Sequence, residues 1–395
     1  ARVIEEMKRE SGSAGPDIVP AQLVKDSDGS EGAPTIRFVN SLIERAFAER
    51  ASDIHLEPQE GEMVVRMRID GLLRRVLTVP AELQSTVISR LKIMGGMDIA
   101  ERKVPQDGHA MLRVKGSEID LRISSMPTVY GEKIVLRLLN KTSQLLSRDA
   151  IGLEGEDLEY YRTLLKNPSG VILLVGPTGS GKSTTLAALL DRINHTRPGH
   201  IITLEDPIEY IYTPDRCVIN QREIGTDTRS YADGLRAILR EDPDVILIGE
   251  MRDLNTIETA LTAAETGHLV FATLHTNSAA DAIDRMVNVF PDGRQAQIRL
   301  QLSTTLRAVL SQQLLPKRAS AGRIAACEIM VVTDAIRNLI REAKTPQIDS
   351  FITMDSRSVT MDQSLRRLVQ DRVVSFDTAL SYARDREAFR SAAQP

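Results

Sequence analysis

The chain has 395 residues, of which 42% are hydrophobic and 26% charged, and its formal net charge is −4 with an isoelectric point near 6.0. This length predicts two or three domains, and the composition is that of a globular protein rather than a disordered or fibrous one. Without a basic excess, and with aromatic residues at 4% and no tryptophan, nucleic acid is not an expected partner.

The cysteines and the apolar segments indicate the cellular compartment of the protein. Cys217 and Cys327 lie far apart and neither belongs to a CxxC pair, which argues against a disulfide framework or a cysteine zinc site and favours the cytosol. No apolar run approaches the roughly 20 residues that span a bilayer, and no signal peptide is visible. Because the chain opens with Ala1 rather than methionine, we expect a fragment of a longer protein.

The first predicted elements are helical. Residues 1–33 indicate a short helix followed by a linker rich in glycine, serine, proline and charge. Residues 36–51 then place apolar side chains at helical spacing, which predicts an amphipathic helix. These side chains are Ile36, Val39, Leu42, Ile43, Ala46 and Phe47.

The period changes in the following segment. Residues 62–77 alternate apolar and charged side chains around Asp70-Gly71, which predicts a β-hairpin. Residues 82–96 read as a helix ended by two glycines. Three short strands are predicted after it, at 108–114, 117–124 and 132–139. Residues 34–141 are therefore predicted to form a small α+β domain.

The second half of the chain has a different pattern. Residues 142–169 are predicted to connect the halves, and from Gly170 buried apolar runs alternate with long helical segments. This alternation predicts an α/β domain with a mainly parallel sheet over 170–395, with a mostly helical tail from about Ser303. The predicted strands are 171–176, 200–206, 244–250 and 268–275.

A phosphate-binding loop is the strongest motif. Residues 176–183 match GxxxxGK[ST], with a predicted strand before them and a predicted helix after them. Such a loop curls its N–H groups toward phosphate, Lys182 is expected to reach the β- and γ-phosphates of ATP, and the Ser183 hydroxyl to bind Mg²⁺. The alternative, a glycine-rich turn with a surface lysine, does not explain both flanking elements. The predicted nucleotide-binding residues are Gly176, Pro177, Thr178, Gly179, Ser180, Gly181, Lys182, Ser183 and Thr184.

Acidic residues follow two of the predicted strands. Glu250 comes just after the apolar run 245–248, and Glu205 and Asp206 end another such run. Since ligands bind outside the carboxyl ends of parallel strands, we expect these acids to converge on the loop. Hydrolysis needs a partner for Mg²⁺ and a group that orients water. The alternative is that strand-end acids begin solvated loops.

Two histidines stand at opposite ends of a predicted strand. His268 precedes the run LVFATL and His275 follows it. A histidine near the γ-phosphate could sense hydrolysis, but from spacing alone a buried, satisfied histidine is the preferred interpretation. No further cysteine or histidine stands at ligand spacing, so no zinc site is expected.

Taken together, these motifs resemble the secretion ATPase superfamily that powers type II secretion and type IV pili. The resemblance covers nearly all of residues 34–345. In the second half of the chain, the resemblance rests on four motifs: GPTGSGKST, ITLEDPIEY, LRAILREDPDVILIGEMRD and TGHLVFATLHT. In this order they look like the family's Walker A loop, aspartate box, Walker B region and histidine box. In the first half the motifs are ASDIHLEP, MRIDG, MDIAERKVPQDG and GEKIVLRLL.

The resemblance implies a homohexameric ring whose subunits join a PAS-like domain to a RecA-like ATPase domain. It implies that Glu205 polarises water, that Glu250 supports Mg²⁺, and that His268 and His275 are functional. It also implies an inner-membrane platform protein as partner and a cytoplasmic, peripheral location. Arginines that would reach ATP on domain closure match Arg68, Arg122, Arg137, Arg236 and Arg240.

The residues themselves support part of this arginine set. Arg137 interrupts an apolar run, where a charge is costly unless it is paired. Arg236 and Arg240 are four residues apart, which predicts one shared helix face. Ordinary salt bridging is the alternative for all five arginines.

The chain also departs from the family pattern. Family members that drive secretion or pilus extension commonly carry a four-cysteine zinc segment, whereas the corresponding stretch 311–330 holds Cys327 alone. Residues 335–342, AIRNLIRE, resemble a motif of pilus retraction motors. The predicted function is an ATPase motor for pilus assembly or type II secretion. The alternatives are a retraction motor of the same superfamily, a nucleic-acid translocase and a non-hydrolysing nucleotide switch.

Overall fold

The computed structural model describes residues 32–69, 71–140, 163–318 and 322–391. They fall into two compact units, an N-terminal unit within 1–142 and a C-terminal unit within 143–395. Most of the predicted helix and linker in 1–33, and most of the predicted connection in 142–169, lie outside the described residues. Asp70 of the predicted hairpin turn also lies outside them.

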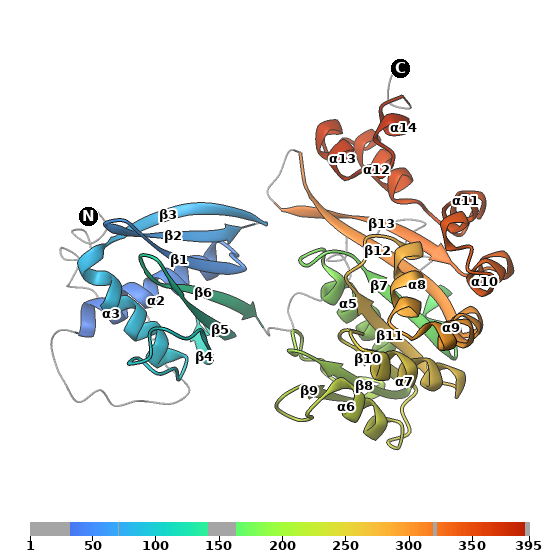
Figure 1. Cartoon of the computed structure of the whole chain (residues 1–395), viewed down its shortest axis with the longest axis horizontal. Helices are drawn as coiled ribbons and strands as arrows, with labels where there is room; N and C mark the ends of the chain where they lie inside the picture. Colours follow the sequence, from blue (N-terminus) through green and yellow to red (C-terminus); the bar gives the residue numbers. More distant parts are fainter. Residues whose placement is uncertain (1–31, 70, 141–162, 319–321, 392–395) are drawn as a thin grey trace. The chain divides into compact units, whose positions relative to one another are not determined.

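The N-terminal unit is built on a six-stranded sheet (Figure 1). Its order is β3-β2-β1-β6-β5-β4, and every neighbouring pair is antiparallel. The strands are β1 Asp53–Gln59, β2 Glu62–Ile69, β3 Leu72–Pro80, β4 Gln106–Val114, β5 Ser117–Thr128 and β6 Gly131–Asn140, and the described helices are α2 Gly32–Ala48 and α3 Ala81–Met94.

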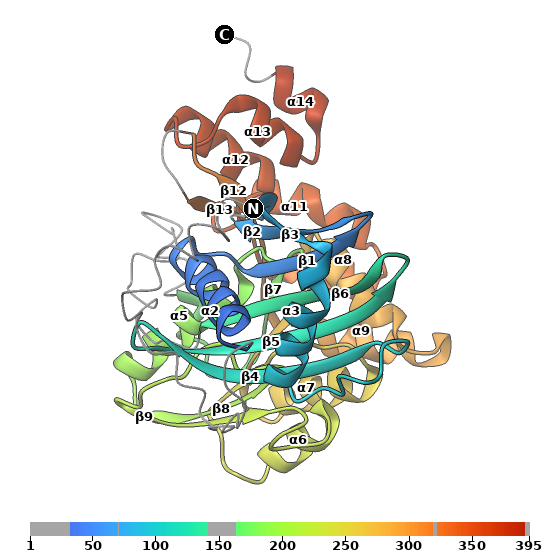
Figure 2. The same cartoon turned by 90° about the vertical axis from the view of Figure 1, so that its left-hand side faces the viewer.

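The two helices α2 and α3 pack on the same face of this sheet, as Figure 2 shows. Val39 and Ile43 of α2 and Leu91 of α3 are buried there against strand residues such as Ile54 and Leu136. Because successive strand side chains point to opposite faces, the charged residues that alternate with the core positions lie on the other face. The amphipathic helix, the hairpin and the three short strands that the sequence predicts are confirmed.

The C-terminal unit contains a seven-stranded sheet in the order β13-β12-β7-β11-β10-β8-β9. The pairs from β12 to β9 are parallel, and β13 is antiparallel to β12. A mainly parallel sheet is therefore confirmed. The strands are β7 Gly170–Val175, β8 Gly199–Glu205, β9 Cys217–Glu223, β10 Val245–Ile248, β11 Leu269–Leu274, β12 Leu306–Pro316 and β13 Arg323–Val331.

Helices cover both faces of this second sheet (Figures 1 and 2). Val171, Leu173 and Val175 of β7 pack into one core, and Ile172 and Leu174 pack into the other. Strands buried on both faces read as continuous apolar runs, which is why the sequence reveals them. The helices are α5 Lys182–Thr196, α6 Tyr231–Ile238, α7 Leu254–Glu265, α8 Ala279–Asn288, α9 Asp292–Thr305, α10 Asp334–Arg341, α11 Ile348–Met354, α12 Met361–Gln370, α13 Phe376–Tyr382 and α14 Arg386–Ser391.

The predicted helical tail from about Ser303 is wrong for residues 306–316 and 323–331, which form the antiparallel pair of strands β12 and β13, called the hairpin below. Strand β12 lies beside β7 and is buried on both faces along most of its length. Its apolar run therefore lacks the alternation that marks a half-exposed strand, and tertiary contacts decide the structure. Helices follow from α10 onward, and α12–α14 share a small core with Leu315 and Ala326 of the hairpin.

Within the described ranges, no helix has both the length and the apolar character needed to cross a membrane.

Candidate active site

The phosphate loop connects the end of β7 to the start of α5, so the predicted strand and helix on its two sides are confirmed. Gly176, Gly179 and Gly181 have φ angles of +144°, +79° and +88°, a region that residues with a Cβ rarely adopt. A Cβ on Gly181 would also lie 2.8 Å from Nε2 of Gln312. The loop conformation therefore requires glycine for both backbone and packing reasons.

Lys182 is the first residue of α5, and only 8% of its surface is exposed. Its Nζ donates to the carbonyl oxygens of Gly176 at 2.7 Å and Pro177 at 3.1 Å. Burial lowers the pKa of the ammonium, and the negative charges of Glu250 and Glu209 oppose that effect. The lysine is thus held inside the loop, within electrostatic reach of Glu250 and Glu209.

A side chain that sequence reasoning missed supports the loop from β12. Gln312 donates from Nε2 to the Ser180 carbonyl at 2.8 Å, and its Oε1 accepts from the Thr185 hydroxyl at 2.8 Å. Both ends of this buried amide are therefore satisfied by the loop and the first turns of α5. The available signal is a group of three polar residues, Ser311, Gln312 and Gln313, inside an otherwise apolar run.

Glu205 is the last residue of β8 and is 9% exposed. Its Oε1 accepts from the Thr203 hydroxyl at 2.6 Å and from Nε2 of Gln221 at 3.3 Å. Burial raises the pKa of this carboxyl to about 7, because it outweighs the two neutral donors. A carboxylate with this proton affinity is suited to accept a proton near neutral pH.

Glu250 follows β10 and has the opposite environment. Its Oε2 lies 2.6 Å from Nη2 of Arg252, and its Oε1 lies 3.3 Å from Nε2 of His275. Burial tends to raise the pKa of Glu250, but the hydrogen bond from Arg252 and the charge of His275 outweigh it, so the pKa is lowered. The carboxylate is ionised at neutral pH and is suited to support a cation. Arg252 is a second residue that the sequence reasoning missed.

The two predicted histidines lie at opposite ends of β11. His275 follows the carboxyl end and contacts Glu250. His268 precedes the strand, and its Nδ1 lies 2.9 Å from the Ala263 carbonyl oxygen and 3.2 Å from the Thr266 hydroxyl. The structure brings His275 to Glu250 and leaves His268 at the other edge of the sheet.

Of the two arginines predicted to share a helix face, Arg236 lies on α6 and pairs with Asp233 at 3.7 Å. Arg240 lies beyond the helix, which ends at Ile238, so the shared helix face is wrong. After Leu239, the N–H groups of Arg240 and Glu241 donate to carbonyl oxygens three residues back, and Asp242 has φ +51°, which stops a further turn. Both arginines are exposed.

The three arginines of the N-terminal unit lie in one row across its sheet. Arg122 of β5 is opposite Arg137 of β6, which is opposite Asp53 of β1, which is opposite Arg68 of β2. Asp53 pairs with Nε of Arg137 at 3.1 Å and with Nε of Arg68 at 3.6 Å. The side chain of Arg137 is still 60% exposed, so its guanidinium can meet a further anion.

A glycine-rich loop between a strand and a helix, at the carboxyl ends of a mainly parallel sheet, defines a P-loop nucleotide-binding protein. Residues 28–381 match the family model described as "Type II/IV secretion system protein". The chain therefore belongs to the type II/IV secretion system protein family.

Relatives support the same placement. The chain is 47% identical to "Type II secretion system protein E" of Aeromonas hydrophila over 289 residues, 73% of this chain and 56% of that protein. It is 40% identical to "Type II secretion system protein HxcR" of Pseudomonas aeruginosa over 344 residues, 81% of this chain and 71% of that protein. The chain thus spans little more than half the length of the Aeromonas relative.

Two solved structures share the fold. The pilus retraction motor PilT with bound ADP has a TM-score of 0.69 and 39% identity, covering 89% of this chain and 99% of that one. The ATPase DotB of Yersinia pseudotuberculosis has a TM-score of 0.74 over 93% of this chain and 99% of that one. At 23% identity the DotB likeness shows the fold alone.

Proposed function

We propose that this chain is the hydrolytic core of a homohexameric motor that uses ATP to drive type II secretion or type IV pilus assembly at the cytoplasmic face of the inner membrane. The observation that carries the proposal is the electrostatic contact between Lys182 of the phosphate loop and Glu250 after β10, with the buried carboxyl of Glu205 at the end of the neighbouring strand β8. Family membership supports it. In finer terms, residues 34–141 would be a PAS-like domain and 170–395 a RecA-like ATPase domain.

The phosphate loop would bind the triphosphate of ATP. Its backbone N–H groups and the N-terminus of α5 favour negative charge. The Lys182 ammonium, which hydrogen-bonds two loop carbonyls, would exchange these for β- and γ-phosphate oxygens. The donor set also fits Mg²⁺, because a Ser183 hydroxyl and an ionised Glu250 are hard oxygen ligands. When bound, Mg²⁺ would neutralise charge on the phosphates.

Glu205 would orient and deprotonate the attacking water. Its pKa of about 7 makes it a stronger base than an ordinary glutamate, and its hydrogen bond from Thr203 fixes one oxygen. His275 would report the state of the site through Glu250. Arg68, Arg122, Arg137, Arg236 and Arg240 would supply positive charge as the ring closes on ATP. His268 would act on a neighbouring subunit.

A phosphate-release assay with purified chain and Mg-ATP tests the proposal. Lys182→Ala should abolish turnover, and Glu205→Gln should keep ATP binding while lowering kcat by about 10²–10⁴, the range for a lost general base. Lys166→Ala and Glu241→Gln, both at exposed positions, are the matched controls and should behave like the wild type. Wild-type turnover in Glu205→Gln would refute the role of that residue.

A pilus retraction motor is the second candidate. The likeness to PilT, at 39% identity over 99% of that chain, and the AIRNLIRE motif on α10 favour it. Deletion in the source cell separates the candidates. Loss of secreted proteins or of surface pili would indicate secretion or assembly, whereas surface pili that accumulate without movement would indicate retraction.

A further inference from the structure

The short loop between β11 and α8 carries His275 and is held from outside the nucleotide site. The loop covers residues 275–278, between Leu274 at the end of β11 and Ala279 at the start of α8. Nε2 of His275 lies 3.3 Å from Glu250. Whatever fixes this loop therefore also fixes the histidine against the acid that would support Mg²⁺.

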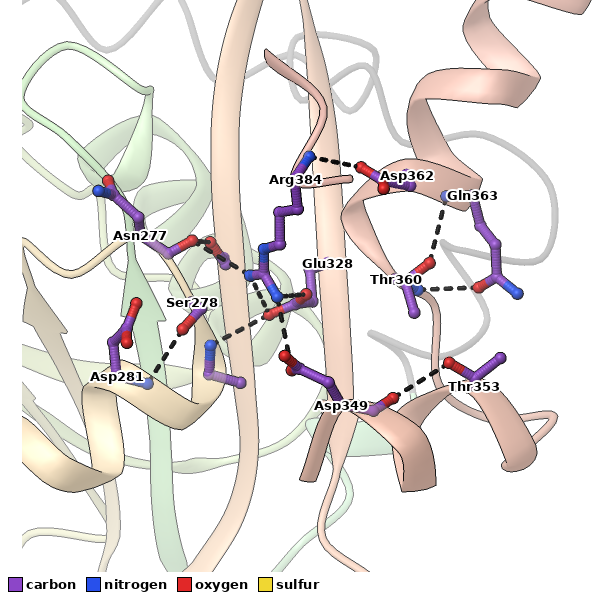
Figure 3. A network of polar contacts seen from close by, with 12 residues as sticks. Asn277, Ser278, Asp281, Glu328, Asp349, Thr353, Thr360, Asp362, Gln363 and Arg384 are labelled. Carbon is purple, nitrogen blue, oxygen red and sulfur yellow. Dashed lines mark hydrogen bonds and ion pairs between the residues drawn. The ribbon is translucent and has the colours of Figure 1, made fainter. Parts of the chain in front are cut away.

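Three contacts fix the loop two to four residues beyond His275. The carbonyl oxygen of Asn277 accepts from the Ser311 hydroxyl at 2.8 Å and from Nη2 of Arg384 at 3.3 Å. The N–H of Ala279 donates to Oε1 of Glu328 at 3.0 Å. Figure 3 shows Arg384 and Glu328 meeting beside Asn277. Strands β12 and β13 supply Ser311 and Glu328, while Arg384 comes from the segment between α13 and α14.

Arg384 and Glu328 form an ion pair in which the carboxylate is buried and the arginine side chain is 31% exposed. Nη2 of Arg384 donates to Oε1 of Glu328 at 2.7 Å, and Nη1 lies 2.7 Å from Oε2 in an ion pair. Glu328 has no exposed surface, so its charge needs this partner. A guanidinium presents several donors in a rigid plane. It can therefore hold both carboxylate oxygens and the Asn277 carbonyl at once, with Asp349 3.5 Å from Nη1.

The backbone of Arg384 is in turn tied to α12. The N–H groups of Arg384 and Asp385 donate to the two carboxylate oxygens of Asp362 at 2.9 and 3.2 Å. Arg384 stands between α13 and α14, which pack with α12 around their own small core. The guanidinium thus joins this helical group to the histidine loop (Figure 3).

We propose that Arg384 is a positioning residue of the ATPase site: by tying α12–α14 to the loop 275–278, it holds His275 against Glu250 and makes ATP turnover depend on how the C-terminal helices are seated. This inference rests on the proposed ATPase function. It places a point of control at the last helices of the chain, where a partner that shifts α12–α14 would slow or speed hydrolysis without touching the nucleotide.

Arg384→Lys tests the proposal with the least disturbance. Lysine keeps a cation beside Glu328 but cannot also donate to Asn277 in the same geometry. We expect kcat to fall about tenfold, because displacements near 1 Å from productive geometry cost up to about 10²-fold. The KM for ATP should stay within about twofold and the melting temperature close to the wild type, since the loop does not build the phosphate site. Arg357→Lys, whose partner Asp355 lies 3.2 Å away in the same region, is the control.

A second variant separates the loss of the contact to Asn277 from the cost of leaving Glu328 as a buried unpaired charge. Glu328→Gln combined with Arg384→Met leaves no buried unpaired charge, so it should recover the stability that Arg384→Met alone loses, yet keep the low kcat. Hydrogen exchange of the peptide that contains residues 275–279 should rise in both the lysine and the double variant. Wild-type kcat and wild-type exchange in either folded variant would overturn the proposal. If the wild type hydrolyses no ATP, the proposed function fails, while the exchange experiment still decides whether Arg384 holds the loop.

Discussion

The two units place their charged residues in different parts of a sheet. In the N-terminal unit, Arg122, Arg137, Asp53 and Arg68 lie side by side across four antiparallel strands. In the C-terminal unit, Glu205, Glu250 and His275 follow the carboxyl ends of parallel strands. The first arrangement is a strip of charged side chains across one face of a sheet. The second is a cluster of charged side chains along one edge of a sheet.

The difference arises because helices cover both faces of one sheet and one face of the other. Helices pack on both faces of the C-terminal sheet, so a charge in the middle of a strand would be buried without water. Helices α2 and α3 pack on one face of the N-terminal sheet, and the other face can carry a row of arginines. A strip of this kind is suited to meet an anion presented by another surface, whereas strand ends enclose a ligand.

Among the substitutions that test this comparison of the two units, those in the arginine row should have the largest effect. We expect Arg122→Ala and Arg137→Ala to lower kcat by about tenfold or more with the fold intact, since arginine fingers contribute up to about 10³–10⁵. Phosphate release per subunit is the measurement, and it should rise with protein concentration as rings form. Arg113→Ala, which removes an exposed arginine paired with Glu118, is the control. If the activity per subunit stays constant on dilution to monomers, the arginine row does not act across subunits.

The two strand-end acids, Glu205 and Glu250, should affect how the stability of the protein changes with pH. The pKa of Glu205 is raised from 4.5 to about 7 in the folded chain, so between these values the folded state binds more protons and stability falls as pH rises. Each tenfold change in proton affinity corresponds to about 1.4 kcal/mol. Glu205→Gln should therefore stabilise the protein at pH 8, by an amount of the order of 3 kcal/mol, and much less near pH 5. Denaturant unfolding at both pH values is the measurement.

Glu250, at the same edge of the sheet, should give stability the opposite dependence on pH. Its pKa is lowered in the folded state, so it contributes stability above its unfolded pKa that is lost as pH falls through the folded value. Glu250→Gln should destabilise the protein at pH 8, because Arg252 and His275 lose their charged partner. Equal effects of the two substitutions at pH 8 would contradict the contrast between the two acids.

The smallest effect is expected on α10, which belongs to neither site. Ile336, Leu339 and Ile340 are buried in the core, while Arg337 pairs with Asp334 at 3.1 Å on the same helix. Replacing Arg337 and Arg341 together by alanine should change stability within about 0.5 kcal/mol, as surface substitutions usually do, and leave phosphate release unchanged. Loss of pilus movement or secretion in cells, with hydrolysis intact, would instead show that the polar face of α10 transmits motion.

Local pattern was sufficient wherever a residue and its context are close in sequence. The phosphate loop stands between its own strand and helix, and Glu205 and Glu250 end recognisable apolar runs. The row formed by Arg68, Arg122 and Arg137 could not be predicted, since strand register is set by the whole sheet. The roles that the resemblance implies for these arginines and for the histidines stay predictions.

The supporting groups were missed because their partners are remote. Gln312 lies 132 residues from Ser180 and Arg384 lies 56 residues from Glu328, so no spacing rule connects them. Strand β12 was expected as helix, which hid the amide that meets the phosphate loop. Arg252 is near Glu250 in sequence, but an arginine two residues after an acid carries no signal until the turn between them is known.

The position of β12 decides where this protein can be cut. Because β12 pairs with β7 and carries Gln312 to the phosphate loop, removing the chain from residue 306 onward would leave β7 at the edge of its sheet, with unpaired backbone groups. Chimeras that exchange the C-terminal segment between homologues should therefore join after Val332, so that strand and loop stay from the same parent. Because Arg384 contacts the loop 275–278 and α12–α14 pack on Leu315 and Ala326, such a chimera should stay active only when the incoming segment brings the same contacts.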